Sequence, residues 1–178
     1  MTVDTRAQAC SASAAILLLL SAGCASARPQ LSNSPALGRP VDVAAPDLRG
    51  REQRVADRVG EVRIVEFWAT WCEPCRDQFT VLEELVRAHQ AGGLLVYAVA
   101  VDEDPAQVAA YLETRPLPFL VLWDKGGTSH GERLALERLP TTLVVDRAGR
   151  VRFVHQGYRT GNAELLGSEV RQLLKEPR

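Results

Sequence analysis

The sequence predicts an α/β fold in which a central mixed β-sheet is flanked by helices. Two apolar runs, residues 62–68 and 94–101, are rich in β-branched and aromatic residues, which is typical of strands buried on both faces. Between them, residues 74–90 carry apolar side chains at helical spacing. Strands joined through a helix are predicted to be parallel, because such crossovers return to the same sheet. Two later runs, residues 139–145 and 151–155, flank a turn and add antiparallel strands.

Composition indicates one domain and an export segment. The chain has 178 residues, of which 46% are hydrophobic, so a packed core is expected. The formal net charge is −1, and acidic and basic residues are interspersed. No basic stripe indicates a nucleic-acid partner, and no polybasic run indicates electrostatic binding to a membrane.

Residues 1–24 are predicted to be an export signal. Arg6 gives a weakly positive start, and the apolar stretch 14–20 is too short to span a bilayer stably. Small residues leading to Cys24 resemble a lipoprotein cleavage box, which would make Cys24 a lipidated first residue. The alternatives are plain secretion after cleavage at residues 25–27, or an uncleaved anchor. All three place the domain outside the cytosol, on the periplasmic side of a bacterial membrane in the lipid-anchored case.

The segment after the signal is predicted to be a flexible tether. Residues 25–40 contain Pro, Ser, Ala and Gly without periodicity; the alternative is that they form an edge of the fold. Short strands at 41–44 and 53–55, joined by a turn at 47–51, predict an N-terminal hairpin. The folded domain is therefore predicted to span residues 41–178.

The middle of the chain predicts a further helix and strand. Asp104 and Pro105 suit the N-cap and the first residue of a helix, whose inward face holds Val108, Tyr111 and Leu112. Pro116 ends this helix, and a strand at 119–123 and a short helix at about 131–137 follow.

The last third predicts a strand pair and a closing helix. Pro140 stands before a strand, where proline is allowed at the first residue. Residues 146–149 turn the chain into the antiparallel strand 151–155. The last helix is predicted to be capped by Thr160 or Asn162. Its inward face would comprise Leu165, Leu166, Val170, Leu173 and Leu174.

Cys72 and Cys75 lie where the first core strand stops and a helix begins. Pro74 suits the first turn of that helix, since its missing N–H would be unpaired there anyway. The free N–H groups and the helix dipole favour a negative sulfur at Cys72, and a thiolate is the attacking species in disulfide exchange. We predict a redox dithiol in which Cys72 is the exposed nucleophile and Cys75 the buried resolving cysteine.

Two alternatives for the cysteine pair are weaker. A tetrahedral zinc site needs four ligands, and the only other cysteines, Cys10 and Cys24, lie in the export segment. A structural disulfide closing so short a loop would remove little entropy from the unfolded chain. His89, His130 and His155 are scattered along the sequence and are predicted to be surface or helix-end residues. No metal and no cofactor are expected.

Two motifs carry a resemblance to a known family. WATWCEPC, residues 68–75, resembles the active site of thioredoxin-like proteins, most closely the exported TlpA/ResA-type thiol–disulfide oxidoreductases. Leu139-Pro140-Thr141-Thr142 matches the second motif of the same family. The resemblance covers residues 40–178 and implies a thioredoxin-like fold with an N-terminal β-hairpin and an inserted helix and strand at about 103–123.

The resemblance also implies roles for residues around the cysteines. The Leu139–Pro140 peptide bond would be cis, with Pro140 against the two sulfurs and the backbone of Leu139 pairing with an extended substrate strand. The groove would further include Trp71, Glu73, Pro74 and Thr141. The Glu-Pro dipeptide between the cysteines resembles that of the reducing ResA-like members.

Glu66 is the predicted proton carrier. It interrupts an apolar strand six residues before Cys72, and the resemblance implies a buried acid that relays the proton of Cys75. Burial would raise its pKa toward neutral pH, which suits proton transfer; the alternative is a carboxylate that reaches solvent. Ala98 stands where thioredoxins have a partnering lysine, and Gln78 where ResA-like proteins have an acid.

The implied function is reduction of protein disulfides outside the cytosol. Disulfide-containing proteins would be the substrates, apocytochrome c among them, and a membrane thiol-transfer protein would supply electrons. The rival hypotheses are an oxidant or isomerase of the same fold, a copper-handling module, and an inactive peptide-binding domain.

Overall fold

The computed structural model describes residues 34–128, 131–134 and 137–177 of the chain. A sheet with strand order β5-β4-β3-β6-β7 forms its centre. Its strands are β3 (Val62–Trp68), β4 (Leu94–Ala100), β5 (Leu120–Trp123), β6 (Thr141–Val145) and β7 (Val151–Gln156). β3, β4 and β5 are parallel neighbours, whereas β6 is antiparallel to both β3 and β7. The predicted mixed sheet is confirmed.

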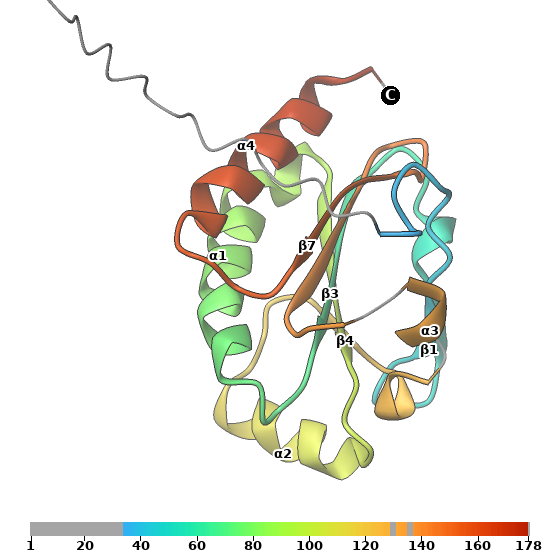
Figure 1. The fold of residues 1–178 in the computed structure, drawn as a ribbon, viewed down its shortest axis with the longest axis vertical. Helices are drawn as coiled ribbons and strands as arrows, with labels where there is room; N and C mark the ends of the chain where they lie inside the picture. Colours follow the sequence, from blue (N-terminus) through green and yellow to red (C-terminus); the bar gives the residue numbers. More distant parts are fainter. Residues whose placement is uncertain (1–33, 129–130, 135–136, 178) are drawn as a thin grey trace, which may run out of the picture.

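Helices cover the sheet and close its ends (Figure 1). The helices are α1 (Glu73–His89), α2 (Pro105–Thr114), α3 (Gly131–Leu134) and α4 (Asn162–Lys175), with short 3-10 turns η1 (Val55–Asp57), η2 (Gln90–Gly92) and η3 (Lys125–Gly127). α1 and α4 lie side by side over one face of the sheet, and the N-terminal segment and α3 lie over the other. Two apolar clusters fill these layers. The predicted caps of α4 are wrong, because Gly161 with φ 89° is the N-cap and no side chain caps the helix.

The N-terminal hairpin is present but shifted along the chain. β1 (Ala44–Pro46) pairs with β2 (Glu52–Arg54), whereas strands were expected at 41–44 and 53–55. The turn sets this register, because the Asp47 carboxylate accepts hydrogen bonds from the backbone N–H groups of Arg49 and Arg51.

The predicted tether ends earlier than expected. Ala36 is buried, the Gly38 N–H donates to the Val151 carbonyl at 2.8 Å, and Pro40 forms a bridge with Arg150. Residues 34–40 are therefore part of the folded domain, and the boundary at residue 41 is wrong. The predicted export signal and Cys24 lie outside the described residues. Among the described residues, no helix has the length and apolar character needed to cross a bilayer.

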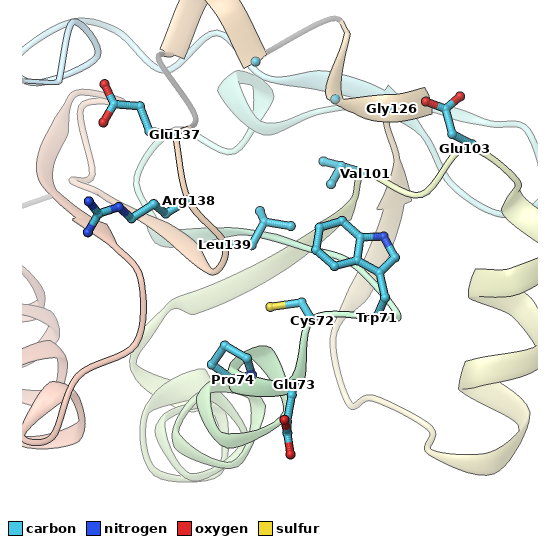
Figure 2. A pocket seen from close by; sticks show the side chains of 12 residues that line it. Trp71, Cys72, Glu73, Pro74, Val101, Glu103, Gly126, Glu137, Arg138 and Leu139 are labelled. Carbon is cyan, nitrogen blue, oxygen red and sulfur yellow. The ribbon is translucent and has the colours of Figure 1, made fainter.

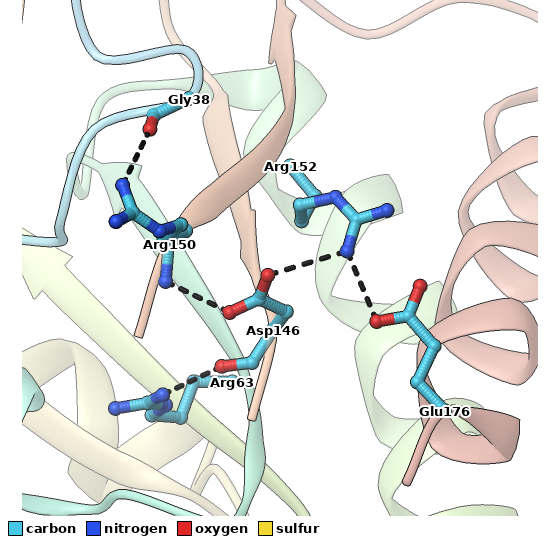
Figure 3. A network of polar contacts seen from close by, with 6 residues as sticks. All are labelled: Gly38, Arg63, Asp146, Arg150, Arg152 and Glu176. Carbon is cyan, nitrogen blue, oxygen red and sulfur yellow. Dashed lines mark hydrogen bonds and ion pairs between the residues drawn. The ribbon is translucent and has the colours of Figure 1, made fainter. Parts of the chain in front are cut away.

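A polar network joins the start of β3 to the turn between β6 and β7, at the end of the sheet away from the cysteines (Figure 3). The Asp146 carboxylate accepts hydrogen bonds from the Arg150 backbone and from Arg152, which also pairs with Glu176 after α4. The Asp146 carbonyl accepts from the buried guanidinium of Arg63 at 2.6 Å. Burial lowers the pKa of Arg63, and each of its three side-chain nitrogens donates to a backbone carbonyl. This network anchors β3 at the end remote from the cysteines.

Candidate active site

The two cysteines occupy the junction of β3 and α1. Cys72 is the N-cap of α1, and its own N–H donates to the Ala69 carbonyl at 3.0 Å. A disulfide joins Cys72 to Cys75, which lies in the first helical turn beside Pro74. Cys72 is 5% exposed and Cys75 is 1% exposed. In the disulfide form Cys72 is therefore buried rather than exposed as predicted, and it is the more exposed of the two residues.

Cys72 reaches solvent through a pocket of about 780 Å³, which we call the cysteine pocket (Figure 2). Trp71, Glu73, Pro74 and Leu139 line it, as the resemblance implies. The remaining lining residues, absent from the sequence-based prediction, are Val101, Glu103, Gly126, Gly127, Gly131, Glu137 and Arg138. They come from the segment after β4, from η3, from the start of α3 and from the loop before β6. Cys75 does not line the pocket, so only Cys72 is presented to a partner.

The loop before β6 brings a second motif to this pocket. The Leu139–Pro140 peptide bond is cis, as the resemblance implies. Leu139 lines the pocket, whereas Thr141 does not. Thr141 is buried, and its hydroxyl donates to the carbonyl of Arg138. The expectation that the Thr141 side chain contributes to the groove is therefore wrong; it fixes the loop that carries Leu139.

Glu66 is fully buried in β3, on the same face as Ile64 and Trp68. Its Oε2 accepts a hydrogen bond from Thr142 Oγ1 at 2.6 Å, and its Oε1 has no hydrogen-bond partner among the described residues. Burial raises the pKa of Glu66 to about 8, and the Thr142 hydrogen bond opposes that rise. The alternative of a carboxylate in solvent is wrong. Ala98 is the neighbour on β4, so no lysine partners the acid there.

Two polar residues lie next to this acid, and sequence reasoning named both without predicting their hydrogen bonds. Thr142 on β6 is paired in register with Glu66, and Gln78 on α1 is buried and donates from Nε2 to Thr142 Oγ1 at 3.2 Å. The signal for Gln78 was available, since it falls on the inward face of α1 beside Phe79 and Leu82.

A second buried carboxylate holds the segment before Cys72. Asp102, just after β4, accepts hydrogen bonds from the Thr70 hydroxyl at 2.6 Å and from the Thr70 N–H at 3.1 and 3.2 Å. The Asp102 carbonyl accepts from Trp123 Nε1 at 2.8 Å. Sequence reasoning missed Asp102, although an acid directly after a buried strand marks the sheet edge where the cysteines lie.

The two tryptophans of the motif have opposite environments. Trp68 is fully buried and packs its ring against Phe79 and Tyr111, with centroids 4.9 and 5.2 Å away. Trp71 is 71% exposed at the rim of the cysteine pocket. Of the two, only Trp71 is available to a partner, in keeping with its implied place in the groove.

Comparison with known proteins places this site in a family. A model described as the AhpC/TSA family matches residues 38–154. The chain belongs to the AhpC/TSA family. Among its relatives, the thiol-disulfide oxidoreductase ResA of Geobacillus thermodenitrificans is 32% identical over 122 residues, 67% of this chain and 68% of the relative. The thioredoxin-like protein YneN of Bacillus subtilis is 32% identical over 122 residues, 67% of this chain and 70% of the relative.

A solved structure agrees with the fold. A Chlorobium tepidum protein described as a thiol:disulfide interchange protein DsbE has a TM-score of 0.72 at 29% identity, covering 78% of this chain and 97% of that one. This AhpC/TSA family chain is a thiol–disulfide oxidoreductase of thioredoxin-like fold, and that prediction from the CxxC and Leu-Pro-Thr-Thr motifs is confirmed.

His89 and His155 do not line the cysteine pocket. His89 ends α1, and His155 Nε2 lies 2.7 Å from Glu169 Oε2 of α4. Across the described ranges, no group of three or more His, Cys, Asp or Glu side chains is arranged to hold a metal ion.

Proposed function

We propose that this chain is an exported reductant of protein disulfides that works through Cys72 and Cys75. The observation that carries the proposal is the asymmetry of the pair: both sulfurs lie at the start of α1, but only Cys72 lines the pocket. The N–H groups and dipole at the start of α1 favour the thiolate of Cys72 over the thiol.

The reaction transfers two electrons from the dithiol to the substrate. The Cys72 thiolate attacks one sulfur of a substrate disulfide, and the other substrate sulfur leaves as a thiolate that takes a proton from water. Cys75 then gives its proton to the Glu66 carboxylate and attacks Cys72. The bond between Cys72 and the substrate breaks, and the second substrate sulfur leaves as a thiolate. The enzyme is left with the Cys72–Cys75 disulfide, and the substrate with two reduced sulfurs.

The direction of the reaction follows from the dipeptide between the cysteines. Glu73 and Pro74 resemble the dipeptide of the reducing members of the family. Glu73 lines the cysteine pocket next to Cys72, and its negative charge opposes formation of the Cys72 thiolate. A membrane thiol-transfer protein would then restore the dithiol. The proposed substrates are disulfide-containing proteins outside the cytosol, with apocytochrome c as one such target.

The proposed location is the periplasmic side of a bacterial membrane, with Cys24 as the lipidated residue. The support for this is the sequence before Cys24. A Cys24→Ala variant should lose its membrane association in cell fractions while its domain still reduces disulfides. Retention of that variant in the membrane would contradict the lipid anchor.

Trapping of mixed disulfides tests the function. In a Cys75→Ser variant expressed in the source cells, Cys72 should accumulate bonded to exported proteins, and a matched variant with both cysteines replaced should trap none. The reduction potential of thioredoxin is about −270 mV and that of DsbA about −120 mV. The potential of the wild-type domain is expected to lie nearer that of thioredoxin. A potential near that of DsbA would contradict the reductant and favour the oxidant.

A further inference from the structure

A buried chain of hydrogen bonds links three elements behind the cysteines. Glu66 of β3, Thr142 of β6 and Gln78 of α1 are each at most 2% exposed. Thr142 Oγ1 lies 2.6 Å from Glu66 Oε2 and 3.2 Å from Gln78 Nε2. Burying three polar side chains between a sheet and a helix is unfavourable unless each is bonded, so this arrangement calls for a reason beyond packing.

The chemistry of the three groups fixes the direction of both hydrogen bonds. An amide nitrogen can only donate, so Thr142 Oγ1 accepts from Gln78. The single hydroxyl proton of Thr142 is then directed to Glu66 Oε2. Glu66 Oε1 is left without a partner among the described residues, so it is the carboxylate oxygen that is free to take a proton.

We propose that Gln78 is a positioning residue for the redox reaction, because it orients the Thr142 hydroxyl toward Glu66 Oε2 and thereby leaves Oε1 as the oxygen that exchanges a proton with Cys75. This inference rests on the proposed function of the Cys72–Cys75 dithiol. Gln78 and Cys75 lie three residues apart on α1, so they share the same side of the helix. α1 thus carries both the resolving thiol of Cys75 and Gln78, the residue that leaves Glu66 Oε1 as the proton acceptor.

The groups that face Glu66 make this control local. Ala98 is its neighbour on β4 and Thr142 its neighbour on β6. His155, the next residue along the register on β7, is bonded to Glu169 of α4. The pKa of Glu66, raised by burial and lowered by Thr142, is not shifted by a nearby charge. Neighbouring side chains therefore stabilise the ionised form of Glu66 through this hydrogen-bond chain.

The proton exchanged at Oε1 belongs to the resolving step. Cys75 gives up its proton to Oε1 and attacks the Cys72 sulfur of the mixed disulfide, and the electron pair of the broken S–S bond leaves on the substrate sulfur. Ionised Glu66 is consumed in this step and restored when Oε1 releases its proton to water. A higher pKa of Glu66 leaves less of the ionised form at neutral pH and slows the step.

The experiment measures the pKa of Glu66 directly and the pH profile of the reaction separately. The reduced protein is labelled with [13C]glutamate, and the Glu66 carboxyl resonance is assigned by its absence in Glu66→Gln. That resonance is then followed from pH 5 to pH 10 in steps of about half a pH unit. The variants are Gln78→Glu, Gln78→Leu, Thr142→Val and Thr142→Ser, with Gln107→Leu on exposed α2 as the matched control. The same proteins reduce a disulfide-bonded peptide in single-turnover reactions over that pH range.

Gln78→Glu replaces the donor by an acceptor that competes for the Thr142 proton, so the pKa of Glu66 should rise by about one unit or more in this variant. The pKa of Glu66 should rise by a similar amount in Thr142→Val, which lacks the hydroxyl. Gln78→Leu should raise it by a smaller amount, and Thr142→Ser should restore the wild-type value. At pH 7 the first two variants should resolve the mixed disulfide about tenfold more slowly, since one pKa unit changes the ionised fraction tenfold.

A Glu66 titration that is the same in folded Gln78→Glu as in wild type overturns the inference, and so does a Thr142→Ser variant that behaves like Thr142→Val. The proposed function fails differently. If the wild-type protein does not reduce the peptide at any pH, the dithiol is not a reductant of disulfides, while the titration of Glu66 still decides whether Gln78 and Thr142 control the carboxyl.

Discussion

Two buried carboxylates lie near the ends of neighbouring parallel strands, and they differ in how they are satisfied. Glu66 of β3 accepts one hydrogen bond, from Thr142, and leaves Oε1 without a partner in the described part of the chain. Asp102, after β4, uses both carboxylate oxygens to accept from the N–H and the hydroxyl of Thr70. Both are at most 1% exposed.

This difference in hydrogen bonding indicates different roles for the Glu66 and Asp102 carboxylates. A carboxylate whose oxygens are occupied by fixed donors holds structure, and Asp102 holds the segment that presents Trp71 and Cys72. A carboxylate with an open oxygen in an apolar environment costs stability when ionised, and it is suited to exchange protons. The two acids thus separate the placing of the nucleophile from the handling of the proton.

The largest effect is expected from Glu66→Gln. The pKa of Glu66 is about 8 in the folded protein and 4.5 when unperturbed, so between these values the folded state keeps a proton that the unfolded state has lost. The free energy of unfolding of the wild type should therefore fall as pH rises from 4.5 to 8. Glu66→Gln removes this fall and should be more stable by roughly 3–5 kcal/mol at pH 9, given about 1.4 kcal/mol per unit.

Urea denaturation of both proteins at pH 5, 7 and 9, on the same buffers, measures that difference. The advantage of Glu66→Gln should shrink toward pH 5, and Glu84→Gln on the exposed face of α1 should show no such trend. An advantage that is equal at the three pH values would mean that Glu66 does not titrate in this range. The variant should also resolve mixed disulfides more slowly, since it lacks the proton acceptor.

The next effect is expected from Asp102→Ala, with the opposite sign. The partly buried N–H and hydroxyl of Thr70 would lose their acceptors. Since an unpaired buried donor costs about 1–3 kcal/mol, a loss of roughly 2–4 kcal/mol is expected for the two. Asp102→Asn keeps one acceptor oxygen and should lose less. Denaturation at pH 7 checks both variants. Equal stability of Asp102→Ala and wild type would show that Asp102 is not a structural anchor.

The same comparison shows what could be predicted from the sequence. β3, α1 and β4 were predictable because apolar periodicity is local, and Glu66 was found because an acid in an apolar run is conspicuous. Asp102 and the Gln78–Thr142 pair were missed because their partners are 32 and 64 residues away along the chain. Local pattern could place Gln78 on the inward face of α1 and Asp102 after a buried strand, but it could not identify the partner that each would bond.

The errors at the N-terminus have a related cause. β1 and β2 are three residues long each, so their limits depend on the Asp47 turn rather than on side-chain alternation. Residues 34–40 look like a linker by composition, yet backbone hydrogen bonds such as Gly38 N–H to Val151 fix them to the domain. Composition does not reveal bonds between backbone groups that are distant in sequence.

A smaller loss is expected from Thr70→Ala. The hydroxyl bond to Asp102 Oδ1 disappears, but the Thr70 N–H still donates to the carboxylate. The loss should be about 1–2 kcal/mol, below that of Asp102→Ala, because a single charge-assisted hydrogen bond is removed. Denaturation of Thr70→Ala and Thr70→Ser side by side tests this, and Ser should recover most of the loss. A Thr70→Ala loss as large as that of Asp102→Ala would assign the anchor to the hydroxyl alone.

The smallest effect is expected at Asp104, an exposed acid two residues after Asp102. Its side chain is the N-cap of α2 and accepts from the Ala106 N–H at 2.9 Å. Asp104→Ala should lower the free energy of unfolding by about 1 kcal/mol, the usual contribution of an N-cap, and Asp104→Ser should retain most of it. Neither variant should alter the rate of peptide-disulfide reduction, because α2 supplies no residue to the cysteine pocket. A reduced rate in Asp104→Ala with normal stability would mean that a change at the start of α2 reaches the cysteine pocket. Asp104 would then help to position Cys72, as Asp102 does, rather than only stabilise the fold.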